Sequence, residues 1–180
     1  MNNVTVTILT TMAGTVFGWL LAQIKLGSVK VLVKEKNDHI FYRNDDIGEV
    51  SEYSNGKFDS IRMDMRLIIS NSKEQKVALR DFEATFYSKN GKVIESVPLK
   101  DTSTITHNSY GIEAKEAKCV IIDAGSSVDM NMFCYLNDYN KAKKVESISV
   151  KYLNSKLKEK SCWLKRVSYS DLKEYRTQEE

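Results

Sequence analysis

The sequence predicts a mainly β protein, in which a single N-terminal transmembrane helix precedes one antiparallel β-sandwich. Three observations lead to this fold class. The segment Val4–Ile24 carries no charged residue, later segments alternate apolar and polar residues, and turn-forming residues separate them at intervals of about ten residues. After the helix about 150 residues remain, which is enough for one domain with its own core. The expected parts are residues 1–27 (tail and transmembrane helix), 28–169 (β-sandwich domain) and 170–180 (C-terminal tail or short helix).

The uncharged segment has the length of a membrane span. At a rise of about 1.5 Å per residue, a helix over Val4–Ile24 crosses a hydrocarbon layer of about 30 Å. The rival interpretations are a secretory signal peptide, which needs a basic start and a small-residue cleavage site, and a buried core helix. No lysine or arginine precedes the span, and Ala22 is the only small residue near a plausible cut. We expect Trp19, Lys25 and Lys30 to be the membrane-interface anchors.

The basic residues around the span predict its orientation. They all follow it, and positive charge close to a span tends to stay on the cytoplasmic side. The prediction is therefore a cell-membrane, single-pass protein with the N-terminus outside and the β domain cytoplasmic. The alternative is a β domain outside the cell.

One side of the predicted helix is lined with small and hydroxyl-bearing residues. Such residues let two helix backbones approach closely in lipid, so this side predicts a helix-packing face. Its members are Thr7, Thr10, Thr11, Gly14, Thr15, Gly18 and Ala22. The partner is the same chain or another membrane protein. In the alternative interpretation, the threonines only bond carbonyls of their own helix.

The strands are predicted from period-two alternation. The clearest case is 61–69, where five apolar residues at odd positions alternate with Arg62, Asp64 and Arg66. Asn90-Gly91 predicts a type I′ hairpin turn, and Pro98 marks a strand end or a sheet edge. The polar stretch 100–118 predicts a long loop followed by one helical turn over 112–118. The expected strands are 29–34, 39–43, 61–69, 77–87, 93–97, 119–122, 128–136, 147–153 and 161–167.

Three segments carry a resemblance to a known fold family. Leu67–Lys73 reads LIISNSK, Arg80–Tyr87 reads RDFEATFY, and Asp123–Val128 reads DAGSSV. This layout resembles small bacterial immunoglobulin-like or LEA14-like sandwiches, in which an Asn-Ser turn joins two core strands and a Gly-Ser turn precedes another. The resemblance covers about a third of the chain and implies an Ig-like β-sandwich, with a small β-barrel as the alternative. Such domains are usually non-enzymatic.

Composition and motifs exclude several function classes. The formal charge of +3 is too small to indicate a nucleic-acid partner, whereas lysines near a bilayer meet anionic headgroups. Three cysteines without metal-ligand spacing do not indicate a disulfide framework, and we expect Cys119 and Cys134 to be buried hydrophobes. The two histidines lie apart from other ligand types. We expect no catalytic residue, no metal and no cofactor.

The predicted function is a non-catalytic, membrane-anchored binding, interaction or sensing module. Its partners are the lipid bilayer and either itself or another membrane protein, while the ligand is unknown. The candidate recognition loop contains His107, Asn108 and Tyr110, because long polar loops on a rigid scaffold often bind ligands. The alternative is a membrane-disrupting or pore-forming effector whose threonines line a defect and whose β domain senses a ligand.

Overall fold

The computed structural model of this chain describes residues 15, 27–43, 50–52, 57–108, 111–167 and 169. Of the predicted transmembrane helix only Thr15 is among them, and it is helical and exposed. The other residues of the proposed packing face, the anchors Trp19 and Lys25, and the tail 170–180 lie outside the described residues. Nowhere in the described part of the chain is there a helix with the length and apolar character that a bilayer crossing needs.

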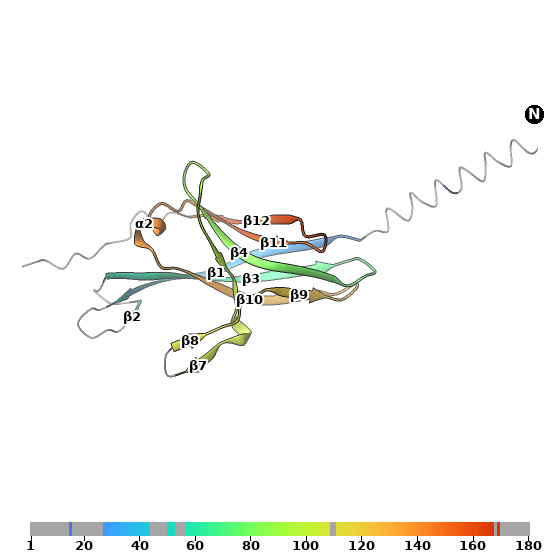
Figure 1. Ribbon diagram of the computed structural model, residues 1–180, viewed down its shortest axis with the longest axis horizontal. Coiled ribbons are helices and arrows are strands. Elements are labelled where there is room, and N and C mark those ends of the chain that lie inside the picture. Colours follow the sequence, from blue (N-terminus) through green and yellow to red (C-terminus); the bar gives the residue numbers. More distant parts are fainter. Residues whose placement is uncertain are drawn as a thin grey trace, which may run out of the picture.

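The described residues form two antiparallel sheets and a separate hairpin (Figure 1). Sheet A has the order β2 (Val50–Ser51), β1 (Val29–Arg43), β3 (Lys57–Asn71), β10 (Ser127–Leu136), β6 (Lys100–Asp101). Sheet B has the order β12 (Glu159–Arg166), β11 (Ser147–Leu153), β4 (Val77–Tyr87), β5 (Val93–Pro98), and β9 (Cys119–Ile122) also pairs with β4. The hairpin joins β7 (Thr106–Asn108) to β8 (Gly111–Glu113), and the short helices are η1 (Thr102–Thr104) and α2 (Tyr139–Ala142).

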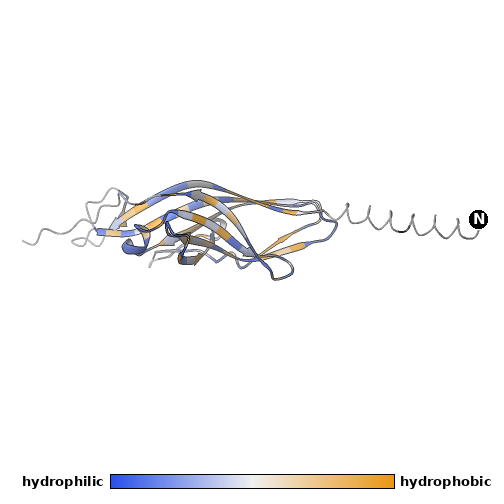
Figure 2. Cartoon of the chain, turned by 90° about the horizontal axis from the view of Figure 1, so that it is seen from above, coloured by the Kyte–Doolittle hydropathy of each residue, from blue (hydrophilic) through white to orange (hydrophobic). Residues whose placement is uncertain are grey.

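The core lies between sheets A and B and follows the predicted alternation. On β3, every second side chain from Ile61 to Ile69 is at most 2% exposed, while Arg62, Asp64 and Arg66 between them face outward. The same period of two appears as alternating apolar and polar segments along the strands in Figure 2. Because a strand turns successive side chains to opposite faces, this pattern fixes which face of each sheet is buried. The predicted antiparallel β-sandwich is confirmed.

Strand β4 changes its inward-facing parity part-way along. Val77 and Leu79 are buried from odd positions, whereas Phe82 and Phe86 are buried from even positions. Asp81 lies between them with a left-handed backbone (φ 52°), and the pairing of β4 with β11 shifts at the same level. This β-bulge adds one residue and turns the strand, so that β4 pairs with β9 before it and with β5 after it.

The chain leaves and re-enters the sandwich at one place beside this bulge. The Leu99 amide donates to the Phe82 carbonyl (2.8 Å), and the Ala117 amide donates to the Leu99 carbonyl (2.8 Å). One step further out, the Asp101 amide donates to the Lys115 carbonyl (2.9 Å). The excursion that contains η1, β7 and β8 is therefore closed at its base by backbone hydrogen bonds.

The two turn motifs that carried the family resemblance contact each other. The Asn71 amide donates to the Ser126 carbonyl (2.8 Å), and the Gly125 amide donates to the Lys73 carbonyl (3.1 Å). Gly125 has φ 64°, a conformation that favours glycine. Asn71 is 1% exposed, and its side-chain amide donates to the carbonyls of the β9–β10 turn. The Asn-Ser and Gly-Ser turns are thus hydrogen-bonded to each other at this end of the sandwich.

Four local predictions need correction. The expected strands 29–34 and 39–43 are one strand, β1, whose register shift between Glu35 and Asn37 absorbs the polar residues between them. The stretch 112–118 is not helical, because its first residues extend as β8 and pair with β7.

The other two corrections concern a turn and a cysteine. In the β4–β5 turn Gly91 has φ 70° but Asn90 does not have a positive φ. The Gly91 amide donates to the Ser88 carbonyl (2.8 Å), so this is a type I turn followed by a left-handed glycine rather than a type I′ turn. Cys119 is exposed, because β9 begins there and directs its even-numbered residues to the core; Cys134 is buried as predicted.

Candidate functional site

The outer face of sheet B carries a row of small hydroxyl side chains that ends in an exposed tryptophan. The cross-strand register places Trp163 opposite Ser149, Ser149 opposite Thr85, and Thr85 opposite Ser96. On β4 and β11 the apolar residues on either side of Thr85 and Ser149 are buried in the core. Small side chains across three strands leave the indole of Trp163 and the ring of Tyr87 standing above the sheet.

Tyr87 contacts both the Trp163 ring and the Ser149 hydroxyl on this surface. Its ring centroid lies 5.3 Å from that of Trp163 at an interplanar angle of 42°. Its hydroxyl is 3.1 Å from the Ser149 hydroxyl, and Ser149 is 0% exposed. Across the next strand pair, the Thr85 and Ser96 hydroxyls lie 3.0 Å apart. Trp163 stays 67% exposed even though its ring is positioned by these contacts. The surface is therefore an ordered aromatic platform with an apolar group facing solvent.

An open groove adjoins the platform at the end of β12. It has a volume of about 450 Å³, and the described residues that line it are Ser147, Trp163, Leu164 and Arg166. The register of β12 on β11 skips Leu164, because Ile148 pairs with Lys165 and Ser149 with Trp163. This bulge explains why two consecutive side chains, Trp163 and Leu164, both reach one groove. We call the platform and the groove together the Trp163 surface.

The Trp163 surface has the composition of a protein-binding site. Tryptophan, tyrosine and arginine are the residues that dominate binding energy at protein interfaces, since they combine large apolar area with directed hydrogen bonds. Here Trp163 and Leu164 supply the apolar wall, and the exposed guanidinium of Arg166 supplies donors for a carboxylate or a carbonyl. The arrangement can bind an apolar side chain next to an acceptor group.

The predicted recognition loop lies elsewhere in the molecule. His107 is exposed on β7 and pairs with Ile112 of β8, while Tyr110 lies outside the described residues. Figure 1 shows the β7–β8 hairpin on the opposite side of the sandwich from β12. The structure therefore does not bring His107 and Asn108 to the Trp163 surface. Lys30, predicted as an interface anchor, is exposed near the start of β1.

The outer face of sheet A carries a polar cluster with a structural role. His39 lies between two carboxylates, with Nδ1 2.6 Å from Glu52 Oε1 and Nε2 3.5 Å from Asp64 Oδ2. Asp64 also accepts from the guanidinium of Arg62 (3.0 Å), which lies 4.5 Å above the ring of Phe133. Phe133 is 1% exposed although it faces away from the core. The cluster thus covers one aromatic ring.

Electrostatic effects at the described residues follow burial and ion pairing. Burial raises the pKa of the Cys134 thiol to about 12, and it also raises the pKa of the Tyr152 hydroxyl. On the outer face of sheet A, the ion pair with Arg66 lowers the pKa of the Asp129 carboxyl. In the part of the chain that is described, no group of three His, Cys, Asp or Glu side chains is placed to hold a metal ion.

Sequence reasoning missed the Trp163 surface. Strand 161–167 is predicted, but Trp163 is not among the candidate site residues that the sequence suggests. A usable signal existed: Trp163 has the same parity as Ser161 and Lys165, and the opposite parity to Cys162 and Leu164. Tryptophan on the polar side of a strand indicates an exposed aromatic. The bulge at Leu164 and the neighbouring Tyr87 depend on the fold and have no local signal.

Solved structures align with this chain only at low TM-scores and low sequence identity. The structural-genomics target SoR45 aligns with a TM-score of 0.37 and 10% identity over 85% of this chain and 96% of its own. The putative ApaA protein from Bordetella pertussis aligns with a TM-score of 0.37 and 7% identity over 79% and 93% of the two chains. A family 123 glycoside hydrolase from Clostridium perfringens aligns with a TM-score of 0.35 and 10% identity over 78% of this chain and 28% of the enzyme. Similarities of this size carry no information about function.

A family assignment comes from the sequence of the domain itself. No curated protein matches the chain significantly. The model of the YopI Ig-like domain matches residues 27–165, which begin two residues before β1 and end within β12. This match covers both sheets, and it agrees with the Ig-like interpretation of the two-sheet sandwich. The chain belongs to the YopI Ig-like domain family.

Proposed function

We propose that this protein is a membrane-tethered, non-catalytic binding module whose Trp163 surface recognises a protein partner. An Ig-like domain suggests a binding or interaction role. The observation that carries the proposal is Trp163, which is 67% exposed while Tyr87 holds its ring in place. An ordered, solvent-facing indole beside a groove loses little conformational entropy on binding and gains large apolar contact.

The tether in this proposal is the uncharged segment Val4–Ile24. Its length suits a bilayer crossing, and the basic residues that follow it favour a cytoplasmic domain. The stripe that includes Gly14 and Gly18 would pair this helix with a second copy or with another membrane protein. Two tethered domains have a high effective concentration for each other, so weak contacts between partners suffice for assembly.

Photo-crosslinking tests the recognition surface. A photoreactive amino acid at Ser161, which is exposed on the same side of β12 as Trp163, is expected to give a discrete protein adduct in native membranes. The same probe at Ile121, which is 64% exposed on β9, serves as the matched control and is expected to give none. Trp163→Ala should lower the adduct yield from position 161 by about 30-fold, the effect of losing a residue that dominates an interface. An unchanged yield in Trp163→Ala would refute the surface.

Fractionation and labelling test the tether. The full chain should stay with membranes after alkaline carbonate extraction; its release into the aqueous fraction would refute anchoring. Cys119 is exposed, so it reports the side on which the domain lies. A membrane-impermeant maleimide should label it only after the cells are opened, and labelling of intact cells would reverse the orientation. Gly14→Leu with Gly18→Leu should reduce crosslinked dimers.

A further inference from the structure

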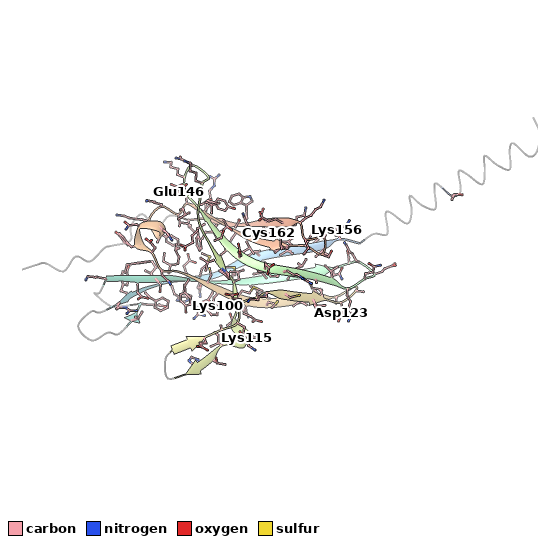
Figure 3. All side chains as sticks on the ribbon, viewed as in Figure 1. Lys100, Lys115, Asp123, Glu146, Lys156 and Cys162 are labelled. Atoms are coloured by element: carbon pink, nitrogen blue, oxygen red, sulfur yellow. The ribbon has the colours of Figure 1, made fainter. Side chains whose placement is uncertain are left out.

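The end of the sandwich at which β1 begins carries three exposed turns. They are the β3–β4 turn at 72–76, the β9–β10 turn at 123–126 and the β11–β12 turn at 154–158. Figure 3 shows Asp123 and Lys156 at this same end, close to the start of β1. The Cys162 thiol, near the third turn, contacts the Val31 carbonyl at 3.5 Å, which ties β12 to the first residues of β1. We call this the Gly27 end.

Gly27 and Ser28 are held directly against the β3–β4 turn. The Ser28 amide donates to the Ser72 hydroxyl (2.8 Å), the Ser72 amide donates to the Ser28 carbonyl (3.0 Å), and the Ser72 hydroxyl donates to the same carbonyl (2.9 Å). Gly27 lies so close to the Ser72 backbone that any Cβ at this position would collide with the Ser72 carbonyl. Position 27 is therefore fixed to the β3–β4 turn.

This junction limits how far the Gly27 end can lie from the predicted span. Only two residues, Lys25 and Leu26, lie between Ile24, the last residue of the uncharged segment, and Gly27. The three Cα–Cα steps from Ile24 to Gly27 reach at most about 11 Å when the chain is fully extended. A bilayer that holds Val4–Ile24 therefore places the Gly27 end at the level of its headgroups.

The β11–β12 turn offers an apolar tip between two lysines. Leu157 is 65% exposed and has a left-handed backbone (φ 56°), which is rare for a bulky side chain. The Asn154 side-chain oxygen accepts from the amides of Lys156 (2.9 Å) and Lys158 (3.1 Å), so the turn is ordered. An exposed leucine in a strained conformation has no packing reason within the sandwich.

The charge at this end is basic once ion pairs are counted. Lys76 pairs with Asp123 (2.8 Å), and Glu159 pairs with Lys151 (3.3 Å). Apart from Asp123, the acidic residue in these three turns is Glu74, which is exposed. The basic residues that remain near the turns are Lys30, Lys73, Lys156, Lys158 and Lys160. This balance complements a surface of negative phosphate groups.

We propose that the Gly27 end docks on a bilayer surface that contains anionic lipid, with Leu157 in the headgroup layer and Lys156 and Lys158 on lipid phosphates. The inference rests on the proposed membrane tether and adds a defined orientation to it. Lysines near an anionic surface attract it, and an apolar side chain inserted beside them adds hydrophobic burial. The tilt of the sandwich, and so the direction in which the Trp163 surface faces, would then depend on lipid charge.

The test uses the full chain in nanodiscs of phosphatidylcholine with or without phosphatidylglycerol. A photoreactive amino acid replaces exposed Ser155 in the β11–β12 turn, and in the control it replaces exposed Asn90 in the β4–β5 turn. The β4–β5 turn is a matched control, because it also carries two exposed lysines, Lys89 and Lys92, beside an exposed aliphatic residue, Val93.

Lipid adducts at position 155 are expected to exceed those at position 90 about tenfold in anionic nanodiscs. Removing the two lysines with Lys156→Gln and Lys158→Gln should weaken docking about fivefold per lysine, and Leu157→Asn should weaken it further while it keeps a residue suited to the left-handed backbone. The control substitutions Lys89→Gln, Lys92→Gln and Val93→Asn should change nothing.

The outcomes separate the two proposals. A chain that enters the nanodiscs but gives equal lipid adducts at positions 155 and 90, or adducts at 155 that do not depend on anionic lipid, overturns the docking and leaves the tether standing. A chain that does not enter the nanodiscs overturns the tether and the docking together.

Discussion

Asn71 is a buried polar side chain that makes four hydrogen bonds to backbone groups, so its loss should destabilise this domain strongly. Its amide nitrogen donates to the carbonyls of Gln75 (2.8 Å), Asp123 (2.9 Å) and Ile122 (3.3 Å), and its oxygen accepts from the Lys73 amide (3.1 Å). A buried hydrogen bond contributes about 1 kcal/mol on average, and its removal also leaves a partner without a bond. Asn71→Ala should therefore lower the free energy of unfolding by about 3 to 4 kcal/mol.

Asn71→Asp sharpens this test, because it keeps the shape and changes only the donors. A carboxylate would face three carbonyl oxygens that now accept from the amide, so the loss should exceed that of the alanine variant at pH 7. This environment would raise the pKa of the new Asp above its unfolded value of about 3.9. A raised pKa means that the folded state binds more protons, so the deficit of the variant should shrink as the pH falls towards 4 and grow as it rises.

The matched control is Asn154→Asp. The Asn154 side-chain oxygen accepts from two amides, and the same change keeps an acceptor there beside Lys156 and Lys158. It should leave stability unchanged or raise it slightly. The assay is equilibrium urea unfolding of the full chain in detergent, followed by circular dichroism, at pH 7 and at pH 4.5. If Asn71→Asp lies within 1 kcal/mol of the wild type at pH 7, the reasoning is wrong.

Three further outcomes are expected. Arg62→Ala removes the cation above Phe133 and a partner of Asp64, so it should cost about 2 kcal/mol in urea unfolding; an unchanged midpoint would mean that other groups cover the ring. Burial raises the pKa of the Cys134 thiol to about 12, so this thiol stays protonated in the folded state, while in the unfolded chain it ionises above about pH 9. The free energy of unfolding should therefore fall by up to about 1.4 kcal/mol per pH unit between these two values. Cys134→Val should remove this pH dependence relative to the wild type. Leu157→Gly relieves a left-handed backbone and should raise the unfolding free energy by about 1 kcal/mol, seen as a higher melting temperature; a lower one would show that Leu157 packs.

Period-two patterns predicted most strands because burial on one face selects apolar residues at every second position. The alternation from Ile61 to Ile69 is the clearest example, and its buried face is the predicted one. The predicted strand 77–87 is also confirmed as β4, but a single period of two does not describe its whole length. Between Leu79 and Phe82 the parity reverses, and only the left-handed backbone of Asp81 explains why both ends of β4 face the core. The residues around Asp81 do not by themselves predict that a β-bulge forms there.

The site was less predictable than the fold, since it is assembled from distant strands. Tyr87 and Trp163 meet only because β4 and β12 both flank β11. The bulge that brings Leu164 to the same groove depends on the register of β12 on β11. By contrast, the proposed recognition loop was chosen for its polarity and length, and the structure places its described part on a separate hairpin. Sequence polarity identified the exposed segment, but it did not identify which exposed surface is ordered.

The hairpin excursion that closes at Leu99 and Ala117 gives this domain a position at which its sequence can change freely. Because backbone bonds join the two ends of the excursion, a longer or shorter tip between β7 and β8 adds only a small loop-closure entropy. A foreign peptide grafted between Asn108 and Gly111 should therefore be displayed without unfolding the host domain. The β7–β8 hairpin is, in this respect, a replaceable insertion on a stable sandwich.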